Sequence, residues 1–126
     1  MLNKAISVAK TRSRIKRHKT GAVITDSKGK IVSLGWSHMT MVSRARYYSM
    51  HAELHAILRA NPKRLNGATI YIATVCKSGN VTSAKPCDAC EAIIREVGIK
   101  SVVYTEYKEV NREKGRSMVT DTGARK

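Results

Sequence analysis

The stretch ATIYIATVCKSGNVTSAKPCDACEAIIREVGIKSVVYTE, residues 68–106, decides the expected fold. Residues 68–75 form a near-continuous β-branched and apolar run, which is typical of a strand buried on both faces. A helix is expected from Cys87 to Val97, closed by Gly98, and residues 99–106 predict a further strand. A strand, a helix and a strand in this order predict two parallel strands joined by a crossover helix.

The residues before this stretch extend the same pattern. Apolar residues at helical spacing predict a first helix over residues 2 to about 14, and residues 21–36 predict two strands around a turn. Residues 37–49 show no clear period and are expected to form a loop. A second helix should run from about His51 to Ala60, where Asn61-Pro62 stops it. The whole order predicts one layered α/β domain.

Length and charge limit the possible functions. A chain of 126 residues favours a single domain over 1–126, within which residues 106–126 lack a clear apolar pattern and are expected to form a weakly ordered tail. The formal charge is +15, from 24 Lys and Arg against 9 Asp and Glu, and the segment KTRSRIKRHK, residues 10–19, is strongly basic. Such a field favours a polyanion or a phosphorylated small molecule, although a basic segment can also be the solvated face of a helix.

Membrane insertion and secretion are not expected. No apolar run approaches the ~18 residues of a membrane span, and no signal-peptide pattern opens the chain. The three cysteines, two of them in a C-x-x-C, fit reduced thiols better than a disulfide framework. We therefore expect a cytoplasmic, intracellular protein.

Two short motifs contain residue types that bind metals. In SMHAELHAILRA, residues 49–60, His51 stands at the expected start of a helix and Glu53 follows in its first turn. In AKPCDACEAI, residues 84–93, Cys87 and Cys90 stand where the next helix begins, and a helix N-terminus stabilises thiolates. If these N-termini meet, one imidazole and two thiolates bind a zinc ion and leave its fourth position open for water. Glu53 could then carry the proton of that water without binding the metal.

Other interpretations of these motifs stay open. His55 lies four residues after His51, on the same helix face, and as a fourth ligand it would close the site against water. His55 lies a full turn deeper in the helix, however, and a closed site gives Glu53 no role, so we favour three ligands. The C-x-x-C alone could be a redox pair. Cys76 is expected to be a small buried thiol rather than a further ligand.

The paired motifs H-x-E and P-C-x-x-C resemble those of the zinc-dependent cytidine and deoxycytidylate deaminase superfamily over roughly residues 19–105, and look most like its deoxycytidylate deaminase branch. The resemblance implies a three-layer α/β fold, with a mixed central sheet of about five strands and helices on both faces. It also implies one Zn2+ per chain, held by His51, Cys87 and Cys90. Zinc-bound hydroxide would attack C4 of cytosine, and Glu53 would carry protons to N3 and to the departing ammonia.

The resemblance says less about the substrate contacts. In relatives, main-chain groups beside the glutamate and before the cysteines hold the edge of the ring. The matching positions here are Ala52 and the segment Ser83, Ala84 and Lys85 before Pro86. Many relatives also carry an asparagine after the second strand, which helps to hold the sugar or the base. This chain has no asparagine from Ile31 to Met50, and Ser37 or His38 could take that role.

The segment SRARYYSMH, residues 43–51, interleaves arginines with aromatic residues. Arg44 and Arg46 could bind a phosphate, and Tyr47 or Tyr48 could stack on a base. Equally, the arginines could face water while one tyrosine packs in the core.

Three functions follow from these observations. The favoured one is deamination of cytosine in a free cytidine or deoxycytidine nucleotide, with dCMP as the leading substrate. The alternative is deamination of cytosine or adenine within single-stranded DNA or RNA, which the charge of +15 favours. A catalytically silent relative that keeps zinc for stability and binds nucleic acid is disfavoured because Glu53 is present. Relatives form dimers or larger rings, so a homo-oligomer is expected.

Overall fold

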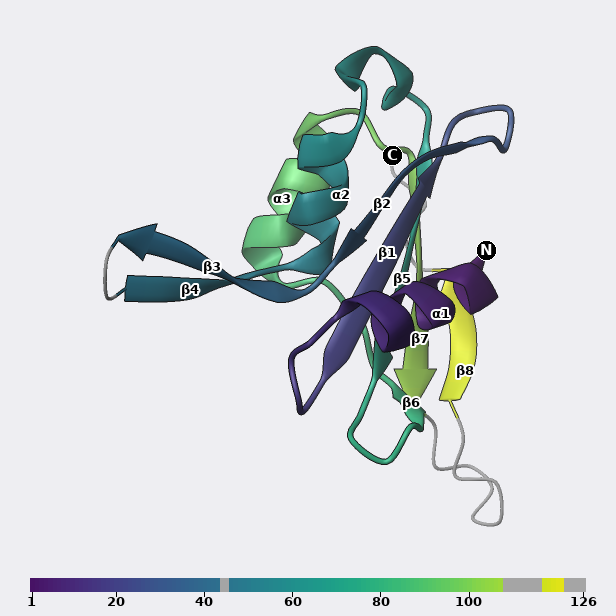
Figure 1. The fold of residues 1–126 in the computed structure, drawn as a ribbon. Helices are drawn as coiled ribbons and strands as arrows, with labels where there is room; N and C mark the ends of the chain where they lie inside the picture. The colour runs from purple at the N-terminus through teal and green to yellow at the C-terminus, as the bar shows by residue number, and fades with distance from the viewer. Residues whose placement is uncertain (44–45, 108–116, 122–126) are drawn as a thin grey trace.

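A computed structural model describes the backbone of residues 1–43, 46–107 and 117–121, and the side chains of residues 1–40 and 49–106. Its helices and strands follow one another along the chain as drawn in Figure 1. They are α1 (Leu2–Arg12), β1 (Lys19–Thr25), β2 (Ile31–Trp36), β3 (His38–Ser43), β4 (Arg46–Met50), α2 (Ala52–Arg59), the 3₁₀ helix η1 (Pro62–Arg64), β5 (Thr69–Val75), β6 (Val81–Thr82), α3 (Asp88–Glu96), β7 (Ser101–Tyr107) and β8 (Ser117–Asp121). None of the helices described is long and apolar enough to cross a membrane.

The central sheet is mixed, as expected. Its strands lie in the order β2-β1-β5-β7-β8, and the short β6 pairs with the end of β5. Strand β1 is antiparallel to both β2 and β5, whereas β5 and β7 are parallel, with Thr69 opposite Ser101. Helix α3 is the crossover between these two parallel strands, so the predicted strand-helix-strand unit is confirmed.

Helices cover both faces of the sheet. Helix α1 lies on one face, and α2 and α3 lie side by side on the other (Figure 1). Two glycines allow this close packing: a Cβ on Gly21 of β1 would meet backbone atoms of Ala5 and Ala9 in α1. A Cβ on Gly35 of β2 would meet backbone atoms of Ala52 and Ala56 in α2. Helices α1 and α2 therefore approach the sheet most closely at these two glycines.

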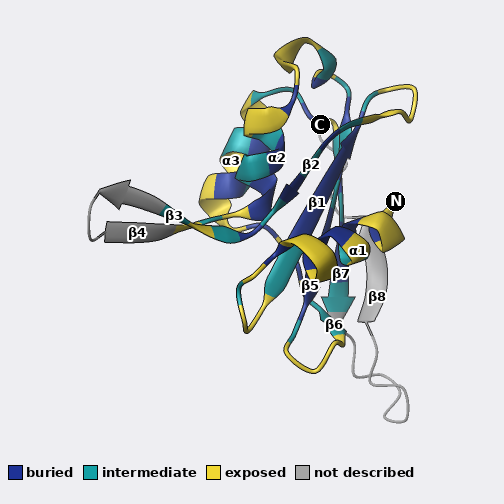
Figure 2. Cartoon of the chain, in the orientation of Figure 1, coloured by how far each residue is buried: buried dark blue, intermediate teal, exposed yellow. Residues whose placement is uncertain are grey.

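The core has two parts, one on each face of the sheet, and Figure 2 shows the buried strands between the helices. Ile70 and Ile72 of β5 pack in the cluster beneath α2 and α3, which includes Ile94. Ala73 packs in the smaller cluster beneath α1, which includes Leu2. Successive residues of a strand point to opposite faces, so β5 is buried on both, as its apolar sequence predicts.

The prediction of a loop over residues 37–49 is wrong. Strands β3 and β4 pair there as a separate two-stranded sheet, with His38 opposite Met50, and Figure 1 shows this hairpin projecting from the body of the fold. A ribbon outside the main sheet needs no alternating apolar face, so its sequence lacks the period by which strands are recognised.

The other predicted boundaries are close to those observed. Helices α2 and α3 each lie within the predicted range, and Gly98 follows α3 with a φ of +94°, which favours glycine. Within the range expected as a tail, β8 pairs antiparallel with β7, and residues 108–116 and 122–126 lie outside the described residues.

Candidate metal centre and active site

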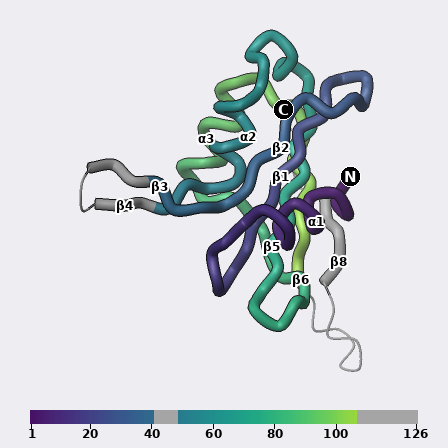
Figure 3. Tube along the Cα trace, viewed as in Figure 1, coloured from purple at the N-terminus to yellow at the C-terminus, as the bar shows by residue number. Residues whose placement is uncertain are grey.

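The N-termini of α2 and α3 bring three metal-binding side chains together. His51 is the N-cap residue of α2, Cys87 is the N-cap residue of α3, and Cys90 lies in the first turn of α3. These helices come from distant parts of the chain yet lie side by side, as the colours in Figure 3 show. The imidazole nitrogen and the two sulfur atoms all lie within 4.8 Å of one another. The predicted meeting of the two N-termini is thus observed.

The spacing of these atoms fits a zinc ion. His51 Nδ1 lies 3.2 Å from Cys90 Sγ and 4.0 Å from Cys87 Sγ. In a tetrahedral site with Zn–N of about 2.0 Å and Zn–S of about 2.3 Å, nitrogen and sulfur are about 3.5 Å apart. The two observed separations bracket that value. Within the described part of the chain this group has three members, and no fourth His, Cys, Asp or Glu side chain has metal-binding spacing with them.

Buried ionisable groups surround this position. Glu53, in the first turn of α2, is 5% exposed, and burial raises the pKa of its carboxyl. Burial, followed by the charge of Glu53, raises the pKa of the Cys90 thiol. Burial thus disfavours the charged form of both groups, and a bound divalent cation would favour the charged forms. The electrostatics therefore agree with the donor set.

His55 does not belong to this cluster. Its Nδ1 accepts a hydrogen bond from the backbone N–H of Trp36 (3.1 Å), and its ring packs edge-on against the indole with centroids 4.4 Å apart. His55 is therefore not a fourth member of this group. Cys76 is also absent from the cluster, but it is half-exposed rather than buried as expected, and its thiol donates to the carbonyl oxygen of Asn80.

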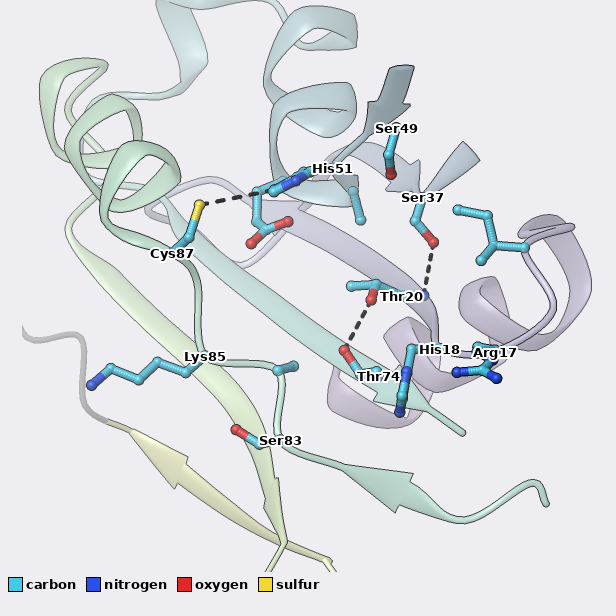
Figure 4. A pocket seen from close by; sticks show the side chains of 14 residues that line it. Arg17, His18, Thr20, Ser37, Ser49, His51, Thr74, Ser83, Lys85 and Cys87 are labelled. Atoms are coloured by element: carbon cyan, nitrogen blue, oxygen red, sulfur yellow. Dashed lines mark hydrogen bonds between the residues drawn. The ribbon is translucent and has the colours of Figure 1, made fainter. Parts of the chain in front are cut away.

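A cavity of about 390 Å³ opens beside the metal-binding group (Figure 4). It is lined by Ile15, Arg17, His18, Thr20, Ser37, Ser49, His51, Ala52, Glu53, Thr74, Ser83, Ala84, Lys85 and Cys87. Its volume lies within the range of about 300–1,000 Å³ typical of small-molecule sites. Two of the metal-binding residues and Glu53 thus face a space large enough for a small substrate.

The predicted substrate contacts divide into three groups. Ser37, Ala52 and Lys85 line this cavity. His38 does not: it lines a neighbouring cavity, where its ring lies 4.5 Å from that of His55. Arg44 lies outside the described residues, as do the side chains of Arg46, Tyr47 and Tyr48, so their predicted roles stay predictions.

The hydroxyl of Ser37 is already engaged with the protein. It accepts a hydrogen bond from the Thr20 N–H (3.0 Å) and lies 2.9 Å from the Ser13 hydroxyl. Because Ser13 donates to the Ser37 carbonyl oxygen (2.8 Å), the Ser37 hydroxyl is left to donate to Ser13 Oγ. In this structure Ser37 therefore links Ser13 to Thr20 at the wall of the cavity through hydrogen bonds.

Sequence reasoning missed several residues that line the cavity. Arg17 and His18 line it from the loop between α1 and β1, and the hydroxyls of Thr20 and Thr74 pair across its floor at 2.9 Å. Ser83 and Ala84 also line it, and the resemblance had already placed these two residues with Lys85 near the ring. The basic run over residues 10–19 was the available signal for Arg17 and His18, but a charge run does not say which of its members face a cavity.

Comparison with known proteins supports this description of the site. Residues 1–106 match the family model described as the cytidine and deoxycytidylate deaminase zinc-binding region. The chain belongs to this family. Membership in the deaminase family confirms the predicted resemblance, and together with the His51, Cys87 and Cys90 cluster it is consistent with one zinc ion.

Relatives with similar sequences agree with membership in the deaminase family. The chain is 27% identical to human deoxycytidylate deaminase over 113 residues, which cover 77% of this chain and 58% of the relative. It is 29% identical to a probable deoxycytidylate deaminase of Drosophila melanogaster over 113 residues, covering 73% and 51%. The chain thus spans about half the length of the curated relatives it matches.

Solved cytidine deaminases have the same fold. That of Burkholderia pseudomallei aligns with a TM-score of 0.56 at 19% identity, over 94% of this chain and 90% of that one. That of Mycobacterium tuberculosis aligns with a TM-score of 0.54 at 21% identity, over 82% and 80%. The expected cytidine-deaminase-like fold is therefore confirmed.

Proposed function

We propose that the protein is a zinc-dependent hydrolase that deaminates the cytosine ring of a free cytidine or deoxycytidine nucleotide, with dCMP as the leading substrate. The observation that carries the proposal is that Glu53 lines one cavity together with His51 and Cys87, two members of the three-residue metal-binding group. An open coordination position with a carboxylate beside it suits hydrolysis, whereas a structural zinc site is closed. The curated relatives named deoxycytidylate deaminase support the nucleotide as substrate.

His51, Cys87 and Cys90 would hold the zinc ion. When bound through three protein ligands, zinc lowers the pKa of a water molecule to about 7 and makes it nucleophilic. The three ligands lie at the ends of two helices packed on one sheet, so the fold itself sets their spacing.

Glu53 would move the protons. Deamination adds water to the amino-bearing C4 of cytosine and releases ammonia, so a proton must pass from the attacking water to ring N3 and another to the leaving amino group. Burial raises the pKa of Glu53, which makes its carboxylate a better proton acceptor than an exposed one. Its place in the first turn of α2, two residues after His51, keeps it next to the metal position.

Deamination within single-stranded DNA or RNA is the second candidate. Basic residues support it, because Arg12 and Arg14 line a second cavity that shares Ile15 as a wall with the first. A strand leaving the active cavity would meet these positive charges.

Ammonia release distinguishes the two candidates. The zinc-loaded protein would be incubated with dCMP, with cytidine and with a cytosine-bearing single-stranded oligonucleotide, each beside Glu53→Ala. Turnover of dCMP that the variant lacks would establish the free nucleotide as substrate. Turnover of the oligonucleotide alone would replace it with the polynucleotide, and no turnover with zinc bound would refute both.

A homo-oligomer is also proposed. Leu58 on α2 is 71% exposed and Met39 on β3 is 56% exposed, so each offers apolar surface that a second copy of the chain would cover. Light scattering coupled to size-exclusion chromatography would give the mass in solution. Leu58→Glu should lower that mass if α2 contributes to the contact.

A further inference from the structure

The active cavity carries basic side chains that the proposed proton transfers do not use. Arg17, His18 and Lys85 line it, and Glu53 is the one carboxylate among its lining residues. In the described part of the chain, no ion pair joins Arg17 or Lys85 to a carboxylate. An uncompensated positive wall in a concave site attracts an anionic group of the ligand.

The loop that carries Arg17 and His18 is anchored by buried hydrogen bonds. At its start, the hydroxyl of Ser13, which is 3% exposed, donates to the Ser37 carbonyl oxygen. At its end, Thr20 exchanges two hydrogen bonds with Ser37: its N–H donates to Ser37 Oγ (3.0 Å), and its carbonyl oxygen accepts from the Ser37 N–H (2.9 Å). Ser37, the residue that follows β2, therefore holds both ends of segment 14–18 through hydrogen bonds.

This anchoring divides the basic side chains of the loop between different surroundings. Arg17 and His18 line the active cavity, whereas Arg14 lines the neighbouring one. Lys16 is exposed, as Arg17 and His18 are, but it lines neither of these two cavities. The loop thus presents a selected pair of donors to the substrate, and Lys16 provides a control of equal charge in the same segment.

The position of this pair suits one part of a nucleotide. Lys85 comes two residues before Cys87, and Figure 4 shows its side chain directed away from Arg17 and His18. Figure 4 shows Arg17 and His18 across the cavity from Cys87 and His51. In a nucleotide the sugar separates the phosphate from the ring, so a ring at the metal position would place its phosphate away from the ligands.

We propose that Arg17 and His18 form the subsite for the 5′-phosphate of the nucleotide, with Arg17 as the main determinant of specificity for nucleotide over nucleoside. This assignment rests on the proposed function, because it takes the ring to lie beside Glu53. The planar guanidinium fork of arginine matches two phosphate oxygens at once, and charge-assisted hydrogen bonds of this kind are among the strongest in proteins.

Steady-state kinetics of the zinc-loaded protein test the subsite. Arg17→Ala should raise the KM for dCMP about tenfold to a hundredfold with little change in kcat, because it removes binding shared by ground state and transition state. The kinetic constants for deoxycytidine should change less than about twofold, since that substrate has no phosphate to lose. Lys16→Ala should leave both substrates within about twofold, and Arg17→Lys should recover part of the loss.

Three results would overturn the subsite while leaving the proposed function standing. Equal losses in Arg17→Ala and Lys16→Ala would mean that only the overall field matters. Equal losses on dCMP and deoxycytidine would mean that Arg17 does not contact a phosphate. A selective loss on dCMP in Lys85→Ala alone would place the phosphate at the opposite wall.

Calorimetric binding separates failure of the subsite from failure of the proposed function. If the wild-type protein releases no ammonia, the proposed function fails, and the affinities for dCMP and deoxycytidine then decide the subsite. A preference for dCMP that Arg17→Ala abolishes and Lys16→Ala keeps would uphold it. Equal affinity for the two compounds would overturn it.

Discussion

Replacing Gly35 by alanine should move α2 away from β2 and disturb the metal site without touching any ligand. A Cβ at this position would meet the Ala52 carbonyl oxygen, the Ala56 nitrogen and, at 2.8 Å, the Ala56 Cα. Carbon atoms pack at about 3.5–4.0 Å, so the helix would have to withdraw by roughly 0.7–1.2 Å. Because His51 and Glu53 stand at the start of this helix, they would move with it.

The expected losses follow from that displacement. Overpacking of this kind costs about 1–3 kcal/mol of the free energy of unfolding, which leaves a domain of typical stability folded. A shift of about 1 Å in catalytic groups costs roughly a hundredfold in rate. We therefore expect a modest fall in the melting temperature of Gly35→Ala, together with weaker zinc binding and a large fall in deaminase activity.

Gly21→Ala is the matched control. Its Cβ would meet backbone atoms of Ala5 and Ala9, and so would displace α1, which carries no metal ligand. Thermal unfolding, bound zinc by mass spectrometry and ammonia release would be measured for both variants. Because α1 leads into the loop that carries Arg17, the comparison uses kcat and not KM. If Gly35→Ala keeps as much zinc and as high a kcat as Gly21→Ala at a similar loss of stability, the packing of α2 on β2 does not position the site.

Three further changes have defined outcomes. Glu53→Gln should lower kcat at least about a hundredfold with zinc still bound, because the amide cannot shuttle a proton; a loss below tenfold in steady-state assays would remove Glu53 from the chemistry. Cys90→Ser should lower both the zinc retained after dialysis and the melting temperature, whereas Cys76→Ser should change neither, and equal zinc retention would contradict the ligand assignment. The Arg64 guanidinium, 2.8 Å away, together with two backbone amides, holds the pKa of Asp26 at about 2. Because this lies below the value of about 3.9 in unfolded chains, the stabilisation is present above about pH 4 and is lost as the pH falls toward 2. Asp26→Asn should therefore unfold at lower urea than the wild type at pH 7, and a difference that stays constant down to pH 2 would refute this.

The elements that carry the zinc motif could be predicted from the sequence because local signals define them. Helix α2 ends at Asn61-Pro62, and α3 ends before Gly98. Glycine is the residue type that most readily adopts the positive φ found there, so both ends are visible in the sequence. The placement of His51 and the two cysteines followed, because each stands at or near a helix start.

Other parts of the site depend on contacts that no local pattern contains. His38 is in the correct part of the chain for a substrate contact, but its strand belongs to the projecting hairpin and turns its ring toward His55. The cavity-lining role of Arg17 depends on Ser13 and Ser37 meeting across the fold, which sequence spacing alone does not reveal. The prediction failed wherever a residue's role is set by a distant partner rather than by its own element.

The surroundings of Trp36 bear on how the protein avoids aggregation. Strand β2 is at one edge of the sheet as described, where free backbone groups could pair with another molecule. At Trp36, however, the N–H donates to the His55 imidazole, and the carbonyl oxygen accepts from His38 Nδ1. The guanidinium groups of Arg12 and Arg59 lie 5.1 Å and 4.9 Å from the centre of the indole ring. At this end of the strand, an approaching chain would therefore meet positive charge and backbone groups that are already hydrogen-bonded. This arrangement disfavours intermolecular β-pairing at this edge of the sheet.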